Sequence, residues 1–596
     1  MSSRLQQRKS TNGRSKLRRI KKPWWNEDLT NARNEYSKVD KQARKSTGEG
    51  RLPLQQKAKQ LRKDLDRKVQ RAKRAHWCKM QEDLLSLQSN NPKEYWRYIG
   101  NLGIGGERQR GVPWEIQRDD GSISTDPTEV LNHWKTSYEQ LLNVGDREEP
   151  SKPAFADAEP PRATGLDRDI ELTEVLRALT TAKNGKATGL DGLPVEVLRN
   201  QSAISFLHEL FKKCFSSGKV PSTWLHNIIS PIPKCNTGDP RDPNSSRGIT
   251  LASCVYKLYC SVLNKRLSVW AEANQRIADE QNGFRKARSC IDHLCSLTEI
   301  IEHRRKKRLP TFAAFIDFSK AYDRIPRSLL WYKLEKLGPD GPFLRALKSL
   351  YQNVKCAIRI NGTHSDFFNV NIGLKQGCLI SPALFNLYVN DLIEEINSIK
   401  CGITVGNEMV SALMYADDMV LISHSEDHLQ QMLNKLHSWC DNWKMTVNAS
   451  KTKVMHFRIG PSVRRSSFVF TCGDKEIGFA DHYRYLGLVL NEFLDYQKTA
   501  TEVAKAATRA LGAVIAKCKA HGDVPYTCFS QLFDTLVQPI IDYAAAVWGH
   551  RSFSCINAVQ HRACRFFLKV GRHTPNTAVT GEMAWRLPQH SCSDIS

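Results

Sequence analysis

The chain has no long apolar run anywhere along its 596 residues. A helix that crosses a membrane needs about 20 consecutive apolar residues, and a secretory signal needs an apolar stretch close to the N-terminus. The first ten residues, MSSRLQQRKS, are polar and basic instead. We therefore expect a soluble intracellular protein with no membrane partner.

The chain also lacks any Cys-x-x-Cys pair, although it contains 17 cysteines. Cys260 and Cys440 lie in apolar runs, where a free thiol behaves as a small hydrophobic group. This pattern predicts a reducing compartment rather than a disulfide framework. Cys555, His561 and Cys564 lack a fourth nearby ligand, so a zinc site is not favoured there.

Acidic residues are scarce relative to basic ones. The chain has 88 Lys and Arg against 62 Asp and Glu, a net charge of +26. The first 80 residues alone hold 25 Lys and Arg and 7 Asp and Glu. A positive field of this size favours a polyanion, with nucleic acid as the leading candidate. An anionic membrane surface and simple solubility are the alternatives.

Composition divides the first part of the chain. Residues 1–24 form a basic tail that we expect to be disordered, residues 25–145 a basic helical extension, and residues 146–168 a linker rich in proline and acidic residues. The aromatic residues interleaved with the basic ones are Trp24, Trp25, Trp77, Tyr95 and Trp96. Such helices suit a phosphate backbone and stacked bases, or equally a docking contact with the next domain.

Beyond residue 168, helical and strand patterns alternate without internal repeats. The helical patterns cover residues 194–217, 253–272, 289–305 and 426–443, and nearly everything after 495. The strand patterns cover residues 227–232, 311–318, 355–360 and 410–422. The fold class predicted is α+β, with antiparallel strands and helices on one face.

Two adjacent carboxylates, Asp417 and Asp418, interrupt the strand pattern at 410–422. The other Asp-Asp pair, at 119–120, is followed by Gly121 and Ser122, as in an exposed turn. Asp417 and Asp418 are flanked by apolar residues on both sides, so the pair sits at the tip of a packed hairpin. Like charges placed there cost free energy unless a cation offsets them.

A third carboxylate, Asp317, ends the apolar strand that begins at Thr311. If this strand lies beside the Asp417–Asp418 hairpin, three carboxylates converge. Oxygen ligands of this kind suit Mg²⁺, and a pair of such ions can activate a hydroxyl and stabilise a leaving pyrophosphate. The sequence therefore predicts a divalent-metal site at this point.

Eight segments follow one another in a diagnostic order. They are KATGLDGLP (186–194), ISPIPKCNTGDPRDPNSSRGITL (229–251), DEQNGFRKARSCIDH (279–293), FIDFSKAYDRIP (315–326), GLKQGCLISPALFNLYVND (373–391), YADD (415–418), NASKTKVMHF (448–457) and YRYLGL (483–488). Together they resemble the reverse transcriptases of non-LTR (LINE-like) retrotransposons, from about residue 20 to residue 590. Each segment is a weak signal, but the set in register is a strong one.

The resemblance implies a right-hand polymerase fold. Its fingers and antiparallel-sheet palm would cover residues 169–490, with a core of about 214–490, and a helical thumb and C-terminal region would cover 491–596. The implied activity is RNA-directed DNA synthesis by two Mg²⁺ ions, with Mn²⁺ as a possible substitute. The implied partners are an RNA template, a DNA primer at a nicked target and dNTPs. The oligomeric state is not indicated.

The resemblance also implies residue roles. Asp317, Asp417 and Asp418 match the metal-binding aspartates, and the Phe318 carbonyl is a further metal ligand. Tyr322 matches an aromatic that lies against the 2′ carbon of the sugar and so favours deoxynucleotides. The other residues that match nucleotide contacts are Lys234, Arg247, Gln376, Gly377 and Lys451, with Lys453 as an alternative to Lys451. Arg285 and Arg288 match contacts to the template backbone, with a surface salt bridge as the alternative.

The chain departs from the family pattern in the fingers. Ser246 and Gly248 stand where the pattern YRPI has an aromatic and a proline. Because glycine adds freedom where proline stiffens a loop, we expect a weaker grip on the nucleotide. No His, Asp and Glu set typical of an endonuclease precedes residue 100, which indicates a fragment or a separate nuclease.

Two alternatives remain open. One is a catalytically decayed element remnant that only binds RNA, and the other is a group II intron-type maturase. A viral RNA-copying polymerase more often has Gly before its Asp pair, where this chain has Ala416. The basic segments 14–22 and 304–308 suit nuclear import or RNA binding, so we expect a ribonucleoprotein of nucleus and cytoplasm.

Overall fold

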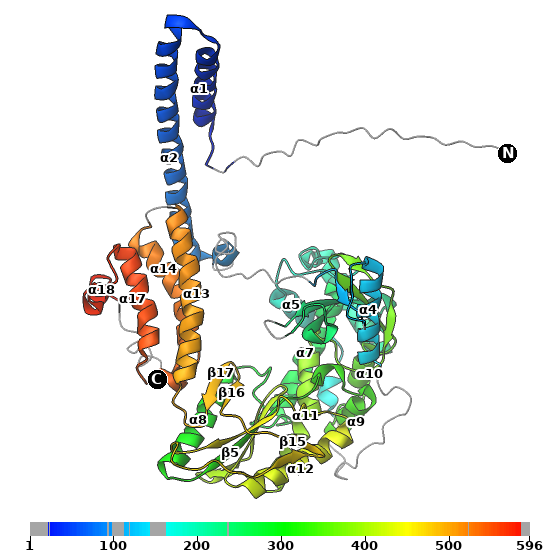
Figure 1. Ribbon diagram of the computed structural model, residues 1–596. Helices are drawn as coiled ribbons and strands as arrows, with labels where there is room; N and C mark the ends of the chain where they lie inside the picture. The colour runs from blue at the N-terminus through cyan, green and yellow to red at the C-terminus, as the bar shows by residue number, and fades with distance from the viewer. Residues whose placement is uncertain are drawn as a thin grey trace, which may run out of the picture. The chain divides into compact units, whose positions relative to one another are not determined.

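The structure is a computed structural model that describes residues 22, 24–91, 94–97, 112–118, 120–143, 163–234, 238–521 and 524–585. The predicted tail lies almost entirely outside the described residues, as does the predicted linker from 146 to 162. The chain divides into two compact units (Figure 1). We call them the helical unit (Met1–Gly106, Val503–Tyr543 and Ser554–Leu587) and the mixed unit, whose main segment is Glu107–Glu502.

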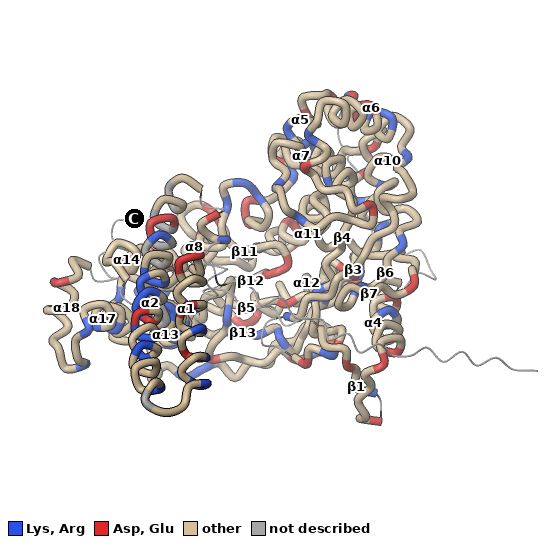
Figure 2. The backbone as a smooth tube through the Cα atoms, turned by 90° about the horizontal axis from the view of Figure 1, so that it is seen from above, with Lys and Arg blue, Asp and Glu red and all other residues tan. Residues whose placement is uncertain are grey.

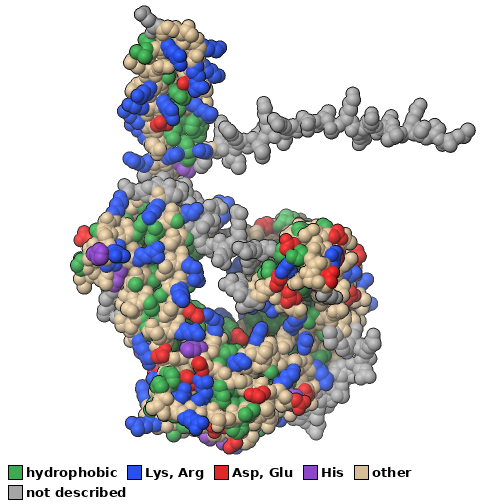
Figure 3. All heavy atoms as spheres, viewed as in Figure 1, with side chains coloured by type: hydrophobic (Ala, Val, Ile, Leu, Met, Phe, Trp, Pro, Cys, Tyr) green, Lys and Arg blue, Asp and Glu red, His purple; other side chains and the backbone are tan. Residues whose placement is uncertain are grey.

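The helical unit contains a hairpin of two basic helices, α1 (Glu27–Lys45) and α2 (Arg51–Asn90). The Asn26 side chain caps α1 by accepting from the Leu29 amide, and acidic residues in the first turn complement the helix dipole. Lys and Arg side chains recur along the face of the hairpin that Figure 3 shows. The other helices of this unit are α14 (Tyr526–Leu536), α15 (Gln538–Asp542), α17 (Ser554–Leu568), α18 (Asn576–Glu582) and most of α13 (Gln497–His521).

The mixed unit is built around an antiparallel sheet in the order β11-β12-β5-β13. Its strands are β11 (Ala412–Tyr415), β12 (Asp418–Ser423), β5 (Thr311–Ile316) and β13 (Lys453–Phe457). Every residue of β5 is buried, as expected for a central strand covered on both faces. Helix α12 (Glu426–Trp443) packs on β12 and β5 with one continuous apolar face, which confirms the helix predicted there.

A second sheet combines two strands that precede β5 in the chain with three that follow it. Strands β4 (Ser246–Leu251), β3 (His226–Pro233), β6 (Val354–Ile360) and β7 (Thr363–His364) are neighbours in that order, and β8 (Phe368–Val370) pairs with β6. Helix α4 (Pro127–Leu141) packs on β6 and β8. Residues 127–141 therefore lie with the mixed unit, whereas the sequence grouped them with the basic extension; the predicted domain boundaries remain predictions.

The remaining helices of the mixed unit enclose the two sheets. They are α5 (Leu172–Thr181), α6 (Gln201–Ser217), α7 (Cys254–Ala273), α8 (Cys290–Lys306), α9 (Arg327–Leu337), α10 (Pro342–Ser349), α11 (Ser381–Ser398) and α16 (Ala545–Trp548). Short hairpins are β1 (Ile116–Gln117) with β2 (Ile123–Ser124), β9 (Ile403–Val405) with β10 (Glu408–Val410), β14 (Phe470–Cys472) with β15 (Lys475–Ile477), and β16 (His482–Tyr485) with β17 (Leu488–Asn491).

Most of the predicted elements are present, which confirms the mixed helix and strand class. The helix predicted for 194–217 begins only at Gln201, because Asn200 caps it and Val197–Arg199 form a separate 3-10 turn. Among the described helices, none combines the length and apolar character that a membrane crossing requires.

Candidate active site

The sheet register brings the three predicted carboxylates together. Strands β12 and β5 are antiparallel neighbours with Met419 opposite Ile316. Asp418 precedes Met419 and Asp317 follows Ile316, so both lie at the same end of the strand pair. Asp317, Asp417 and Asp418 line one cavity of about 950 Å³. The convergence expected from the sequence is thus found, across 100 residues of chain.

A buried glutamine that the sequence analysis missed supports the Asp417–Asp418 turn. Gln281 Oε1 accepts from the Ala416 amide (2.9 Å), and Gln281 Nε2 donates to the Ala416 carbonyl (3.3 Å). Ala416 has a positive φ of 59°, a conformation that costs energy for a residue with a Cβ. At Gly283, a Cβ would lie 2.2 Å from the Ala416 nitrogen, so the supporting segment can approach only as glycine.

The carboxylates repel one another in a recess of the protein. Asp417 and Asp418 are accessible to solvent, yet protein surrounds them closely enough for desolvation to be the main effect on both. Desolvation, followed by the charges of Asp417 and Asp317, raises the pKa of Asp418 to about 6. Desolvation and Asp317 likewise raise the pKa of Asp417, while the Arg247 cation opposes both shifts.

This donor set has the chemistry of a divalent-cation site. Among the described residues, no three His, Cys, Asp or Glu side chains are gathered into a ligand set for one ion. Mg²⁺ commonly takes only one or two carboxylates and completes its shell with water and phosphate oxygens. The pKa values of Asp417 and Asp418 are raised because nearby cations compensate only part of the negative charge at this site. The residues present therefore fit Mg²⁺.

The backbone around Asp317 is held rigidly. The Asp317 amide donates to Thr452 Oγ1 (3.1 Å), and its carbonyl accepts from the Asn448 amide (2.8 Å). Phe318, the predicted extra ligand, forms a β-bridge with Val447 and lines the cavity. These bonds fix where the Asp317 side chain leaves the sheet.

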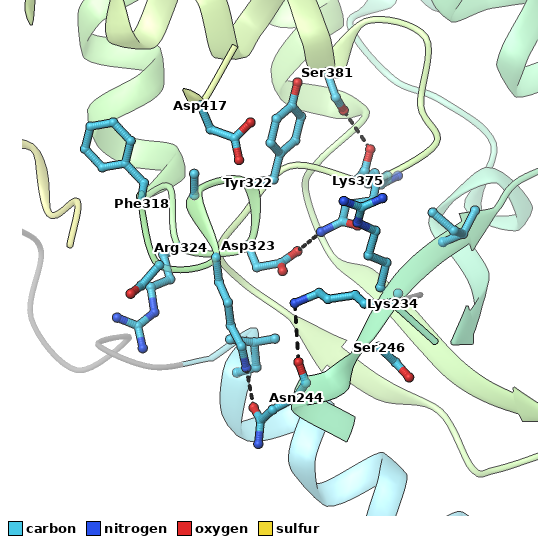
Figure 4. A pocket seen from close by; sticks show the side chains of 18 of the residues that line it. Lys234, Asn244, Ser246, Phe318, Tyr322, Asp323, Arg324, Lys375, Ser381 and Asp417 are labelled. Atoms are coloured by element: carbon cyan, nitrogen blue, oxygen red, sulfur yellow. Dashed lines mark hydrogen bonds between the residues drawn. The ribbon is translucent and has the colours of Figure 1, made fainter. Parts of the chain in front are cut away.

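Tyr322 stands beside Asp417 in the cavity wall (Figure 4). Its ring stacks on Phe385 with centroids 4.5 Å apart and planes inclined by 8°. Its hydroxyl is buried and has no hydrogen-bond partner within the described part of the chain. Burial, and secondarily Asp417, raises the pKa of Tyr322, so the ring acts as a neutral wall.

Gln376 and Gly377 also line the cavity. The Gln376 carbonyl accepts from the Thr250 amide (2.7 Å), which joins this loop to β4. Gly377 has a φ of +105°, and a Cβ there would lie 3.0 Å from the Thr250 carbonyl oxygen. Both facts require glycine at this position.

Asp323 is a further site residue that the sequence analysis did not single out. It faces into the cavity near Lys234 (Figure 4), and its Oδ1 accepts from Gln376 Nε2 (2.9 Å). Burial raises its pKa to about 6, against the opposing effects of Gln376, Lys320 and Lys234. Its position directly after Tyr322 in the sequence could have indicated that Asp323 belongs to the site.

The predicted cations reach the same cavity. Lys234, Arg247 and Lys451 all line it, as does Lys320, which donates to Asn244 Oδ1 (2.6 Å). Lys453 does not line it, so the geometry favours Lys451 of the two lysines proposed. The cavity thus combines carboxylates with ammonium and guanidinium groups, and Arg247 acts on Asp417 and Asp418 while Lys320 and Lys234 act on Asp323.

Arg285 and Arg288 lie outside the cavity lining and are paired with carboxylates. Arg285 donates to both oxygens of Glu272 and to the carbonyls of Ala278 and Gln281. Arg288 donates to Asp279 Oδ1 (2.7 Å). The ion pairs named as the alternative are therefore present, and a template contact stays a prediction.

Cys555, His561 and Cys564, where the sequence does not favour a zinc site, lie on one helix. These residues lie on α17 or its first turn, and Cys564 is buried in the helix interface.

The chain is similar in sequence to several known proteins. Residues 232–490 match the sequence profile of the family "Reverse transcriptase (RNA-dependent DNA polymerase)". The chain is 24% identical over 405 residues to the RNA-directed DNA polymerase from mobile element jockey of Drosophila melanogaster, covering 66% of this chain and 43% of that protein. It is 29% identical over 271 residues to a Pol polyprotein from the type-1 retrotransposable element R2 of Popillia japonica, covering 45% and 36%.

The chain thus spans less than half the length of these curated relatives. Among solved structures, telomerase from Candida albicans in complex with a telomeric RNA fragment is similar over 65% of this chain and 71% of that one. The identity is 13% and the TM-score is 0.34. The family match and the named relatives confirm the resemblance found in the sequence: residues 232–490 match the reverse transcriptase family, and the chain is similar to polymerases of mobile elements of the jockey and R2 kinds.

Proposed function

We propose that this chain is an RNA-directed DNA polymerase that transfers nucleotides from dNTPs to the 3′-hydroxyl of a primer. The observation that carries the proposal is the meeting of Asp317 with Asp417 and Asp418 in a cavity that Lys234, Arg247 and Lys451 also line. Such a cavity matches a nucleoside triphosphate, whose reacting phosphorus would lie between metal-binding carboxylates and charge-stabilising side chains.

In this proposal, the carboxylates of Asp317, Asp417 and Asp418 and the Phe318 carbonyl hold two Mg²⁺ ions, for which Mn²⁺ can substitute. When bound, these ions supply the activation of the primer hydroxyl and the stabilisation of the leaving pyrophosphate. Protein side chains do the rest. Lys234 and Arg247 bind the triphosphate, and Lys451 lies where it can donate a proton to the departing pyrophosphate.

Tyr322 acts as the sugar gate. Its ring cannot yield easily, because it is stacked on Phe385. A 2′-hydroxyl would have to enter the space that this ring fills, so dNTPs are preferred to NTPs. Gln376 and Gly377, which line the same cavity, let the nucleotide approach the backbone closely.

The nucleic-acid partners follow from charge and from the relatives. The template is RNA, the primer is a DNA end at a nicked target, and the basic α1–α2 hairpin holds RNA. Arg285 and Arg288 contact template phosphates only if their ion pairs open. The protein works as a ribonucleoprotein in nucleus and cytoplasm, which imaging of a tagged chain would test.

Primer extension on an RNA template with Mg²⁺ and dNTPs tests the proposal. We expect extension by the wild type and a loss of about 100- to 1,000-fold in Asp417→Ala, a typical cost of removing a charge-stabilising group. Asp120→Ala is the matched control, because Asp120 belongs to the exposed turn between β1 and β2. No extension by the wild type, or full extension by Asp417→Ala, would favour the RNA-binding remnant instead.

The same assay tests the sugar gate. Replacing dNTPs by NTPs should abolish extension by the wild type and restore part of it in Tyr322→Val. Equal discrimination by both proteins would assign the selection of deoxynucleotides to another residue.

A further inference from the structure

Helix α4 borders the nucleotide cavity, although it comes from a stretch with no polymerase motif. Its buried residues join a hydrophobic cluster with strands β3, β6 and β8; they are Val130, Leu131, Trp134 and Tyr138. The last turn of the helix reaches the cavity through Ser137, Tyr138 and Leu141. Burial, and secondarily the Asp323 carboxylate, raises the pKa of Tyr138.

The Tyr138 ring occupies the space that a side chain at Gly248 would need. A Cβ built at Gly248 would lie 2.6 Å from Tyr138 Cε1 and 3.0 Å from Ile229 Cγ2. Contacts below 3.0 Å do not occur for real Cβ atoms. Gly248 is not among the residues with positive φ, so the ring rather than the backbone conformation requires glycine here. From the sequence we expected Gly248 to loosen a loop. In the structure, an aromatic ring from another element fills the space beside this glycine.

The end of α4 is also bonded to the segment that leads to Gln376. The Leu142 carbonyl accepts from the amides of Asn371 (3.3 Å) and Ile372 (3.2 Å), and Asn143 Nδ2 donates to the Asn369 carbonyl (2.8 Å). This helix thus contacts both nucleotide-facing walls, the β4 strand that carries Arg247 and the loop that carries Gln376.

We propose that Tyr138 is a positioning residue for the incoming nucleotide. Its ring, seated against Gly248, holds β4 and the paired strand β3 at the distance at which Arg247 and Lys234 reach the triphosphate. A buried aromatic ring is suited to this because few rotatable bonds remain to be ordered when it packs. The inference rests on the proposed function and adds a residue that determines nucleotide affinity.

The coupling of the two positions gives a sharp test. Gly248→Ala in the full chain should raise the KM for dNTP about tenfold while kcat changes less than about threefold, because overpacking displaces β4 without touching the carboxylates. Tyr138→Ala should also raise KM. In the Tyr138→Ala background, Gly248→Ala should add little, since the atom with which it collides is gone. Tyr138→Phe, which keeps the ring, should resemble the wild type.

Two controls separate positioning from general damage. Trp134→Phe alters the same buried face of α4 one turn earlier without lining the cavity, and Gly460→Ala adds a Cβ in open space. Neither should change the KM for dNTP. Additive effects of Tyr138→Ala and Gly248→Ala, an unchanged KM in Tyr138→Ala, or an equal rise in Trp134→Phe would overturn the inference. Absence of extension by the wild type would instead overturn the proposed function, and this inference with it.

Discussion

Without a bound metal ion, the folded protein disfavours the ionised form of the Asp418 carboxyl group. Its pKa is raised to about 6 from an ordinary 3.8, so the folded chain holds its proton more tightly than the unfolded chain does. The stability linked to this proton is fully present below pH 3.8 and is lost as pH rises through about 6. The ionised Asp418 carboxylate therefore lowers the stability of the folded protein near neutral pH.

Asp418→Asn should therefore stabilise the protein in the presence of a chelator while abolishing primer extension. A shift of this size corresponds to about 3 kcal/mol, and solvent screening of an accessible side chain reduces the expected gain to about 1 kcal/mol. The check is thermal unfolding of both proteins at pH 7 and pH 4. The gain should be present at pH 7 and absent at pH 4, and a gain that is equal at both would show that charge is not its cause.

Asp323 is expected to act through Gln376. Its carboxylate accepts from the Gln376 amide and so fixes which face of that amide points into the cavity. Asp323→Ala should raise the KM for dNTP about tenfold, the effect of one lost hydrogen bond to a charged group. Asp323→Asn keeps an acceptor oxygen and should have a smaller effect. Steady-state extension kinetics distinguish the two, and equal effects would argue against hydrogen bonding as the link.

At the scale of elements, the β11–β12 hairpin depends on a segment far away in the chain. Residues 280 and 282 form backbone hydrogen bonds with Met414 of β11. The Gln281 side chain forms hydrogen bonds with both the amide and the carbonyl of Ala416. Gln281 is fully buried, so its amide cannot exchange these bonds for water. The hairpin tip that carries the two carboxylates is thereby held in its unusual conformation.

Gln281→Leu should lower both stability and kcat. We expect a loss of about 1–3 kcal/mol of unfolding free energy, since the turn amide is left unsatisfied, and a drop in kcat of about 100-fold as the carboxylates lose their orientation. Gln430→Leu is a matched control. Gln430 clamps Thr471 on the β14–β15 hairpin by bonds of 2.9 Å and 3.0 Å, outside the cavity. It should lower stability alone, and a comparable loss of kcat would contradict the proposed role of Gln281.

At the scale of the whole molecule, positive charge is distributed unevenly. Figure 2 shows Lys and Arg recurring along the α1–α2 hairpin, and α2 alone presents exposed basic side chains over several turns, among them Lys57, Lys59, Arg62 and Lys63. An array of this kind binds a polyanion by displacing its counterions, which makes affinity steeply dependent on salt.

Replacing Lys57, Lys59, Arg62 and Lys63 by glutamine should weaken RNA binding and flatten its salt dependence. For single-stranded RNA, the slope of log K against log salt should fall by up to about 3, because each lost phosphate contact removes about 0.7. Exchanging Lys and Arg at the same four positions keeps the charge and should leave the slope unchanged. Titrations at several salt concentrations provide the measurement, and an unaltered slope in the glutamine variant would place RNA elsewhere.

Local patterns were informative wherever a few neighbouring residues decide the structure. The apolar face of α12 and the buried run of β5 predicted those elements, because helix and strand periods are properties of adjacent residues. The order of the motifs identified the domain and the three carboxylates. The contacts of Arg285 illustrate the limit, since no local pattern shows whether a surface cation meets a carboxylate or a phosphate.

The sequence by itself determined the elements, the family of the domain and the residue types of the site. Only the tertiary structure decided that Asp317 lies beside Asp418, that Gln281 clamps Ala416, that Asp323 bonds to Gln376 and that Tyr138 fills the space at Gly248. Asp323 and Gln376 are 53 positions apart in the chain, and Gln281 and Ala416 are 135 positions apart. Such pairings depend on the simultaneous packing of both sheets and the helices around them, and no stretch of neighbouring residues encodes them.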